Sequence, residues 1–295
     1  MEDFFRYLTS GPEDKQWGIF LTVSGKYTAA PNATYPQKTH PSGYYFNWQT
    51  GRVLNEYQLI FISEGKGIFQ TDSGEFEVNS GTIMVVEPGT KHRYKPDPIT
   101  GWTEYYVGFN GKLAEHFLSN TFEDLKKQPV HYCDNQLEIL DSYQKIYDLV
   151  RTQKPGYHQI ASGLILKILG YVNAQLKSKN FEGMQVETLI NEAKSHIWEH
   201  VHENVDLKKF SKSQSVSYSY FRKIFKLYTG IAPHQYCLDL KIMRAKELLV
   251  SSPKSVKEIT YELGFDSIHY FSRLFKKKTG VSPSQFKMVR ISDQS

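Results

Sequence analysis

Two short segments near the end of the chain carry side chains that suit contact with a polyanion. Neither segment, 217–230 or 267–280, contains an acidic residue. Arginine and lysine neutralise phosphates, and polar side chains hydrogen-bond base edges in the major groove. The pattern predicts DNA contact, with solubilising charge on a helical surface as the alternative. The side chains in question are Ser219, Arg222, Lys223 and Lys226 in the first segment, and His269, Ser272, Arg273, Lys276, Lys277 and Lys278 in the second.

A row of side chains in the first half suits a small polyhydroxylated molecule. Along a strand over 102–109, Trp102, Glu104 and Tyr106 share one face, because side chains alternate between faces. Aromatic rings can stack on the C–H face of a sugar, and a carboxylate accepts hydrogen bonds from hydroxyls. We therefore predict a ligand site inside a barrel, with core packing as the alternative for the aromatic residues.

The basic segments belong to an internal repeat. Residues 217–236 and 267–286 align at an offset of 50 without a gap, and nine of twenty positions are identical. Such a match indicates one supersecondary unit built twice. Ser217 and Ser267 are good N-caps, and a Thr-Gly pair ends each helix. A shorter amphipathic segment precedes each copy, which predicts two helix-turn-helix units, and a long helix over 236–249 joins them.

The elements before the repeat change character near Gly111. Short strands are expected at 57–62, 67–71, 75–78, 82–86 and 102–109, with glycine-containing turns between them, as in a sandwich or small barrel. Helices are then expected over 113–128, 135–152 and 157–178. The last helix has a wide apolar stripe, which either packs on the barrel or forms a homodimer seam.

Composition limits the class of protein. The 295 residues are 40% hydrophobic and 23% charged, typical of a soluble globular chain of about two domains. From residue 190 onward there are 18 Lys and Arg against 10 Asp and Glu, whereas the remainder has 18 against 21. The two cysteines are far apart, and neither an export signal nor an apolar run of membrane-spanning length is evident. We expect a cytoplasmic protein with no membrane contact.

Three stretches of the repeat resemble the signature of the AraC/XylS family of bacterial transcription regulators: ITYELGF at 259–265, YFSRLFK at 270–276 and TGVSP at 279–283. This resemblance covers about 186–290. Less specifically, GTIMVVEPGTKHRY at 81–94 is similar to the family's cupin-like sensor domain. The implied fold is multidomain, with an N-terminal cupin-like β-barrel or jelly roll followed by helices, and a C-terminal all-α domain with two helix-turn-helix units joined by a long helix. The implied boundaries are 1–112 for the ligand-sensing domain, 113–178 for a helical dimerisation region, 179–187 for a linker and 188–290 for the DNA-binding domain.

The resemblance also implies roles for individual residues. Departures at Ser211 and Gln214 from the family's usual small and apolar residues imply a less tightly packed first unit. Base-reading positions fall on Ser219, Arg222, Lys223, His269, Ser272 and Arg273, and Ile268 is left with thymine-methyl or backbone contact. Contacts to the DNA backbone are expected from Ser217, Lys226, Ser267, Lys276, Lys277 and Lys278. The ligand site is expected to contain Arg52, Tyr94, Trp102, Glu104 and Tyr106, where an Arg52–Glu104 structural ion pair is the alternative.

The function expected is that of a transcription regulator, not an enzyme. His92, in a stretch similar to the second cupin motif, is one histidine where a metal site needs several, so we expect neither a metal nor another cofactor. The expected partners are double-stranded DNA, a sugar-like effector, a second copy of the chain through 157–178, and RNA polymerase. A bacterial, nucleoid-associated location follows. The alternatives are a cupin enzyme fused to a DNA-binding domain, and a DNA-binding protein that needs no ligand.

Overall fold

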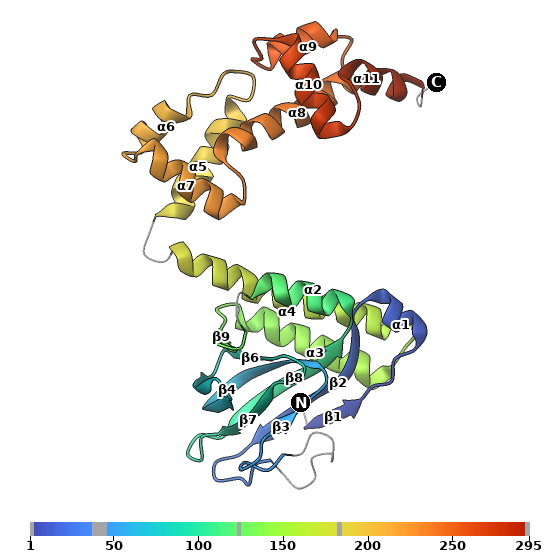
Figure 1. The fold of residues 1–295 in the computed structure, drawn as a ribbon, viewed down its shortest axis with the longest axis vertical. Helices are drawn as coiled ribbons and strands as arrows, with labels where there is room; N and C mark the ends of the chain where they lie inside the picture. The colour runs from blue at the N-terminus through green and yellow to red at the C-terminus, as the bar shows by residue number, and fades with distance from the viewer. Residues whose placement is uncertain (1–2, 37–45, 123–124, 182–184, 293–295) are drawn as a thin grey trace. The chain divides into compact units, whose positions relative to one another are not determined.

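The chain folds into two compact units, residues 1–180 and 181–295. A computed structural model describes residues 3–36, 46–122, 125–181 and 185–292 (Figure 1). The first unit combines an antiparallel sheet with helices, and the second is entirely helical. The multidomain fold class predicted from the sequence is confirmed.

The first unit is built on paired antiparallel strands. A six-strand path runs in the order β1-β2-β8-β4-β6-β9, and β4 also pairs with β5 and β7, which in turn pairs with β3. The strands are β1 Phe4–Tyr7, β2 Phe20–Ala29, β3 Arg52–Val53, β4 Tyr57–Thr71, β5 Gly74–Asn79, β6 Thr82–Val86, β7 Lys91–Pro96, β8 Trp102–Asn110 and β9 Val130–Tyr132.

Strand β4 corrects one expectation. The sequence predicted two strands with a turn between them, but β4 is continuous and its register shifts between Ile62 and Glu64. The shift lets its first half pair with β6 and β8 and its second half with β5 and β7. Gly65 sits there with φ +80°, and an added Cβ would lie 2.1 Å from the Gly101 carbonyl oxygen. The glycine therefore permits a crossing between two layers, not a hairpin turn.

Helices cover one side of the sheet in the first unit (Figure 1). One buried apolar cluster joins the outward faces of β2, β4, β6 and β8 to the helices, and a second fills the space enclosed by the strands. Helix α2 ends earlier than expected, because Phe122 takes an extended conformation before β9 begins. The helices are α1 Pro12–Trp17, α2 Lys112–Thr121, α3 Gln136–Thr152, α4 Tyr157–Ser178 and the short 3-10 turn η1 Lys179–Phe181.

The second unit contains two helical lobes on one long helix. Buried residues of the first half of α8 join α5, α6 and α7, and those of its second half join α9 and α10. Each lobe centres on a fully buried phenylalanine pair, Phe221 with Phe225 and Phe271 with Phe275. The helices are α5 Val186–Glu199, α6 Leu207–Ser213, α7 Tyr218–Thr229, α8 Pro233–Ser251, α9 Val256–Glu262, α10 Ile268–Thr279 and α11 Pro283–Ser292.

Candidate functional site

Helices α7 and α10 are built alike, as the repeat predicted. The Ser217 hydroxyl accepts a hydrogen bond from the Tyr220 amide at 3.2 Å, and the Ser267 hydroxyl accepts one from the Tyr270 amide at 3.3 Å. Gly230 and Gly280 then end the two helices in the left-handed conformation. Because both caps and both apolar faces are satisfied inside each lobe, the opposite faces remain available to solvent.

Those opposite faces carry the basic side chains that the sequence singled out. On α7 the side chains of Ser219, Arg222, Lys223 and Lys226 are exposed. On α10 His269, Arg273, Lys276 and Lys277 are exposed, and Ser272 and Ile268 are half-buried. Each helix thus has a row of exposed cationic side chains, here called its cationic ridge. Such a ridge can contact DNA phosphates while neighbouring side chains reach base edges.

Lys278 does not belong to the ridge of α10. Its ammonium forms an ion pair with Asp239 of α8 at 2.8 Å. Residues two apart on a helix do not face the same way, so Lys278 points away from the side presented by Lys276. This ion pair competes with the DNA-backbone contact that the sequence predicted for Lys278.

Ser211 and Gln214, the two residues of the first helix-turn-helix unit that depart from the family's usual residues, pack differently. Ser211 is 1% exposed, and its hydroxyl donates to the Lys208 carbonyl at 2.9 Å, so it packs without an unsatisfied group. Thr260 in α9 is likewise buried, with its hydroxyl donating to the Val256 carbonyl at 2.7 Å. Gln214, at the end of α6, is half-buried, whereas Leu263 at the end of α9 is fully buried.

A buried cation lies where the two lobes meet. The Lys241 ammonium of α8 is 3.5 Å from the Gly264 carbonyl oxygen and 5.2 Å from the centre of the Phe265 ring. A Cβ on Gly264 would lie 2.9 Å from the Glu203 carbonyl carbon in the first lobe, so the two lobes also touch through backbone. These contacts join the two lobes, and Lys241, Gly264 and Phe265 also line a hollow of about 340 Å³.

The interior of the strand-enclosed space contains the predicted aromatic–carboxylate row. Trp102 and Tyr106 belong to the interior cluster, and Tyr105 and Val107 belong to the cluster under the helices. Glu104 is 0% exposed. The predicted alternation along β8 is therefore confirmed.

Hydrogen bonds connect the remaining predicted residues inside the barrel. Arg52 of β3 donates through Nη2 to the Tyr94 hydroxyl at 2.7 Å and through Nε to His92 Nε2 at 3.1 Å. Glu104 Oε2 accepts a hydrogen bond from the Tyr35 hydroxyl at 2.9 Å. These contacts link Arg52 and Glu104 to different partners, unlike the direct ion pair considered as an alternative.

Burial shifts the pKa values of the polar side chains inside the barrel. It raises the pKa of Glu104 to about 7, although the Tyr35 hydrogen bond and the Arg52 charge both lower that pKa. It also raises the pKa of Tyr94 to about 12 and, with the Arg52 charge, lowers the pKa of His92 to about 3. The neutral His92 ring accepts from Arg52 and lies 2.9 Å from the Thr90 carbonyl through Nδ1. Its lone pair is engaged, so His92 is not poised to bind a metal.

Several buried polar atoms in the barrel have no hydrogen-bond partner among the described residues. They are Glu104 Oε1, Trp102 Nε1 and the Tyr27 hydroxyl. The indole N–H of Trp102 is near enough to Glu104 to lower the pKa of that carboxyl group. However, the indole Nε1 does not form a hydrogen bond of normal geometry with Glu104. Buried polar groups normally find a partner, so this arrangement is suited to a ligand that brings donors and acceptors.

Sequence reasoning missed Tyr35, Phe46 and Tyr27 in this interior. The Tyr35 ring centre is 5.7 Å from that of Trp102 and 6.0 Å from that of Tyr94. Tyr35 and Phe46 belong to the irregular connection between β2 and β3, where no periodic pattern marks a side chain as inward-facing. His92 was available from the pattern, because it lies two residues before Tyr94 on β7.

Most of the apolar stripe predicted on α4 is buried within the first unit. Ala161, Ile165, Ile168, Leu169 and Val172 are buried in the cluster shared with the sheet and α3. The expectation that these positions form a dimer seam is wrong, because they are already covered. The side that faces outward carries Ile160, Gly163, Lys167, Gly170 and Ala174 at alternating spacings of three and four.

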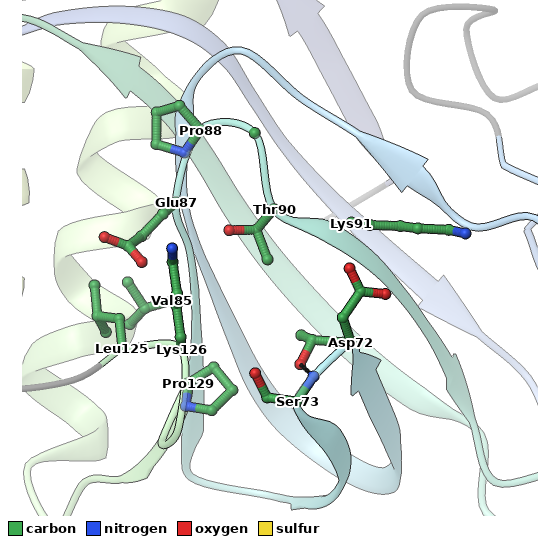
Figure 2. Close-up of a pocket in the computed structure, with 12 residues that line it drawn as sticks. Asp72, Ser73, Val85, Glu87, Pro88, Thr90, Lys91, Leu125, Lys126 and Pro129 are labelled. Atoms are coloured by element: carbon green, nitrogen blue, oxygen red, sulfur yellow. Dashed lines mark hydrogen bonds between the residues drawn. The ribbon is translucent and has the colours of Figure 1, made fainter.

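A separate hollow lies on the outer surface of the first unit. Figure 2 shows it between the β4–β5 turn, the β6–β7 connection and the residues before β9. Its volume is about 240 Å³, and it contains Asp72, Glu87, Lys91 and Lys126 but none of the predicted ligand residues. Among the described residues there is no cluster of three or more potential metal ligands, and no helix is long and apolar enough to cross a membrane.

Comparisons with known proteins agree with the two-unit fold. Residues 32–169 match the model of an AraC-like ligand binding domain, and residues 210–288 match that of a helix-turn-helix domain. The chain is 27% identical over 216 residues to the MmsAB operon regulatory protein of Pseudomonas aeruginosa, covering 72% of this chain and 68% of that protein. It is 24% identical over 219 residues to the lactose operon transcription activator of Staphylococcus xylosus, covering 72% and 77% respectively. Among solved structures, the C-terminal domain of AraT, a response regulator from Geobacillus stearothermophilus, is 30% identical and covers 36% of this chain and 88% of that one, with a TM-score of 0.35.

Proposed function

The chain belongs to the AraC family of DNA-binding transcription regulators, and we propose that its barrel senses a polyhydroxylated small molecule of the sugar class. The domain limits proposed are 1–112 for the sensor, 113–178 for the dimerisation region, 179–187 for the linker and 188–290 for the DNA-binding domain. A regulator of bacterial genes acts at the nucleoid, in the cytoplasm, and RNA polymerase is its natural partner there.

On the DNA side, the ridges of α7 and α10 enter successive major grooves. Arg222, Lys223 and Arg273 are the long cationic side chains among the proposed base readers, with Ser219, His269 and Ser272 beside them. Ser217, Lys226, Ser267, Lys276 and Lys277 hold the backbone. Lys241 keeps the two lobes at a fixed separation, and recognition of two grooves on one DNA face needs about 34 Å.

On the ligand side, one observation carries the proposal. Among the residues that the structure describes, a buried carboxylate oxygen, an indole N–H and a phenol hydroxyl lack partners inside an interior walled by aromatic rings. A sugar offers hydroxyls to the polar atoms and C–H faces to the rings. Arg52, Tyr94 and Tyr106 complete the proposed site. The name of the Staphylococcus xylosus relative connects that protein to lactose, which supports a sugar as the class of effector.

Ligand and DNA are coupled through the dimer. We place the homodimer seam on the outward side of α4, where Ile160 and the small residues Gly163, Gly170 and Ala174 are exposed. Ligand in the barrel favours one arrangement of the dimer and therefore one pair of half-sites. A coupling of about 1–3 kcal/mol between the two sites is typical of such systems.

A thermal-shift screen of mono- and disaccharides on the full chain tests the sensor proposal. We expect one or a few sugars to raise the melting temperature of the wild type, and Glu104→Gln to reduce that shift. If no sugar moves the melting temperature while DNA binding persists, the chain is a DNA-binding protein of another effector class or of none. Stoichiometric iron, manganese or zinc in the purified protein would instead favour a cupin enzyme fused to a DNA-binding domain.

A further inference from the structure

The polar centre of the barrel is already occupied by a side chain of the protein. Tyr35 comes from the connection between β2 and β3, outside the strands that form the walls. Its hydroxyl donates to Glu104 Oε2 at 2.9 Å. Glu104 is fully buried and Tyr35 is half-buried, so the bond reaches from the connection into the barrel.

The Tyr35 ring is surrounded by the same aromatic side chains that would enclose a ligand. Its centre lies 5.7 Å from Trp102 at 89°, 6.0 Å from Tyr94 and 6.0 Å from Tyr27. A planar ring with one hydroxyl therefore sits between rings, with that hydroxyl on the carboxylate. This is the set of contacts expected of a bound hydroxylated molecule.

We propose that Tyr35 occupies the position of the ligand, so that an effector must replace its hydroxyl on Glu104 and move the Tyr35 side chain aside. This inference rests on the proposed ligand function of the barrel and adds a residue that sets affinity and specificity. The chemistry shared by acceptable effectors is a hydroxyl donor attached to a flat or ring-shaped body, which sugars and phenols both provide.

Occupation of the site by Tyr35 should weaken effector binding. When only a fraction of the protein is in the state that can bind, the apparent affinity equals the intrinsic affinity multiplied by that fraction. The hydrogen bond from Tyr35 to Glu104 stabilises the occupied state. Removing the Tyr35 hydroxyl while keeping its ring should therefore raise effector affinity, by about tenfold.

The first arm of the test compares tyrosine-to-phenylalanine variants of the full chain. Affinity is measured by thermal shift and calorimetry for each monosaccharide or disaccharide that binds the wild type. Tyr35→Phe should bind about tenfold more tightly. Tyr27→Phe, which removes a hydroxyl proposed to contact ligand, should bind more weakly. Tyr132→Phe removes a hydroxyl on β9, outside the interior cluster, and serves as the matched control with unchanged affinity. Equal or weaker sugar binding by Tyr35→Phe overturns the proposal.

The second arm does not depend on a sugar. Tyr35→Ala keeps Cβ and leaves a space the size of the missing phenol ring, so phenol itself has the shape of the deleted group. This probe should raise the melting temperature of Tyr35→Ala, leave the wild type unchanged, and have a smaller effect on Tyr35→Ala combined with Glu104→Leu. Equal shifts in the wild type and Tyr35→Ala, or no shift in either, contradict the proposal.

The two arms separate the two ideas. If no sugar binds any variant but phenol stabilises Tyr35→Ala, the role of Tyr35 stands and the sugar class is wrong. If a sugar binds the wild type and Tyr35→Phe equally, the sugar class stands and the role of Tyr35 is wrong.

Discussion

Ser215 and Gly264 occupy the same place in the two helix-turn-helix units, and both have a positive φ, +56° and +64°. The hydrogen bonds around them match. The Val216 amide donates to the Ser211 carbonyl at 3.0 Å, and the Phe265 amide donates to the Thr260 carbonyl at 3.1 Å. The second turn uses the residue that tolerates this conformation, and the first does not.

Ser215→Gly should therefore stabilise the C-terminal unit. Relief of the left-handed strain outweighs the extra flexibility of glycine in the unfolded chain by about 0.5–1 kcal/mol. Calorimetry on the full chain measures the change in the C-terminal transition. Ser213→Gly, at the last residue of α6, is the control and should destabilise by up to about 1 kcal/mol. A loss of stability in Ser215→Gly would show that the serine side chain makes a favourable contact there.

Arg273→Ala should relax base preference at one position of the operator. Loss of a bidentate contact to a base costs about 1–3 kcal/mol on the correct sequence and much less on others. Competition binding against single-base operator variants gives the preference. An equal loss on every sequence would assign Arg273 to the DNA backbone.

Lys277 and Lys278 form a matched pair of neighbouring lysines with different surroundings. Lys277 is exposed, whereas Lys278 is engaged by Asp239 at 2.8 Å. Lys277→Ala should weaken binding on all duplexes and reduce the slope of log affinity against log salt by about one. Lys278→Ala should change that slope much less. Equal slope changes would return Lys278 to the DNA-contacting set.

Glu104→Gln should change how the stability of the first unit depends on pH. The folded pKa of about 7 lies above the ordinary value of 4.5, so the protonated form is favoured by folding. Its contribution to stability is complete below pH 4.5 and is lost as pH rises through 7. Between pH 5 and 8 the wild type should lose about 2–3 kcal/mol relative to Glu104→Gln.

Unfolding in denaturant across that pH range measures the difference. Parallel curves for the two proteins would show that Glu104 is ionised in the folded state at neutral pH. Glu104→Gln should also weaken the response to ligand while DNA affinity in the absence of ligand is unchanged.

The helical unit was predictable because its signals are local. N-cap serines, terminal glycines and phenylalanines four residues apart fix each helix without reference to distant residues. The ion pair of Lys278 was not predicted because the basic run was treated as one face, although Lys276 and Lys278 are two residues apart and point in different directions.

The barrel was predictable only where strands are regular. Alternation along β8 identified Trp102, Glu104 and Tyr106, which the structure brings to one interior. Tyr35 enters from an irregular connection 69 positions before Glu104, and no local pattern reports such a contact. The outward side of α4 was likewise hidden, because a continuous apolar stripe does not say which part the sheet covers.

Selection of duplexes from a random library by the purified protein tests directly whether α7 and α10 read successive major grooves. We expect enrichment, at moderate salt, of sites with two preferred blocks whose centres are about one helical turn apart. We further expect that Arg222→Ala weakens preference in one block and Arg273→Ala in the other. Recovery of no sequence above the random background, or of a single block affected equally by both variants, would contradict this expectation.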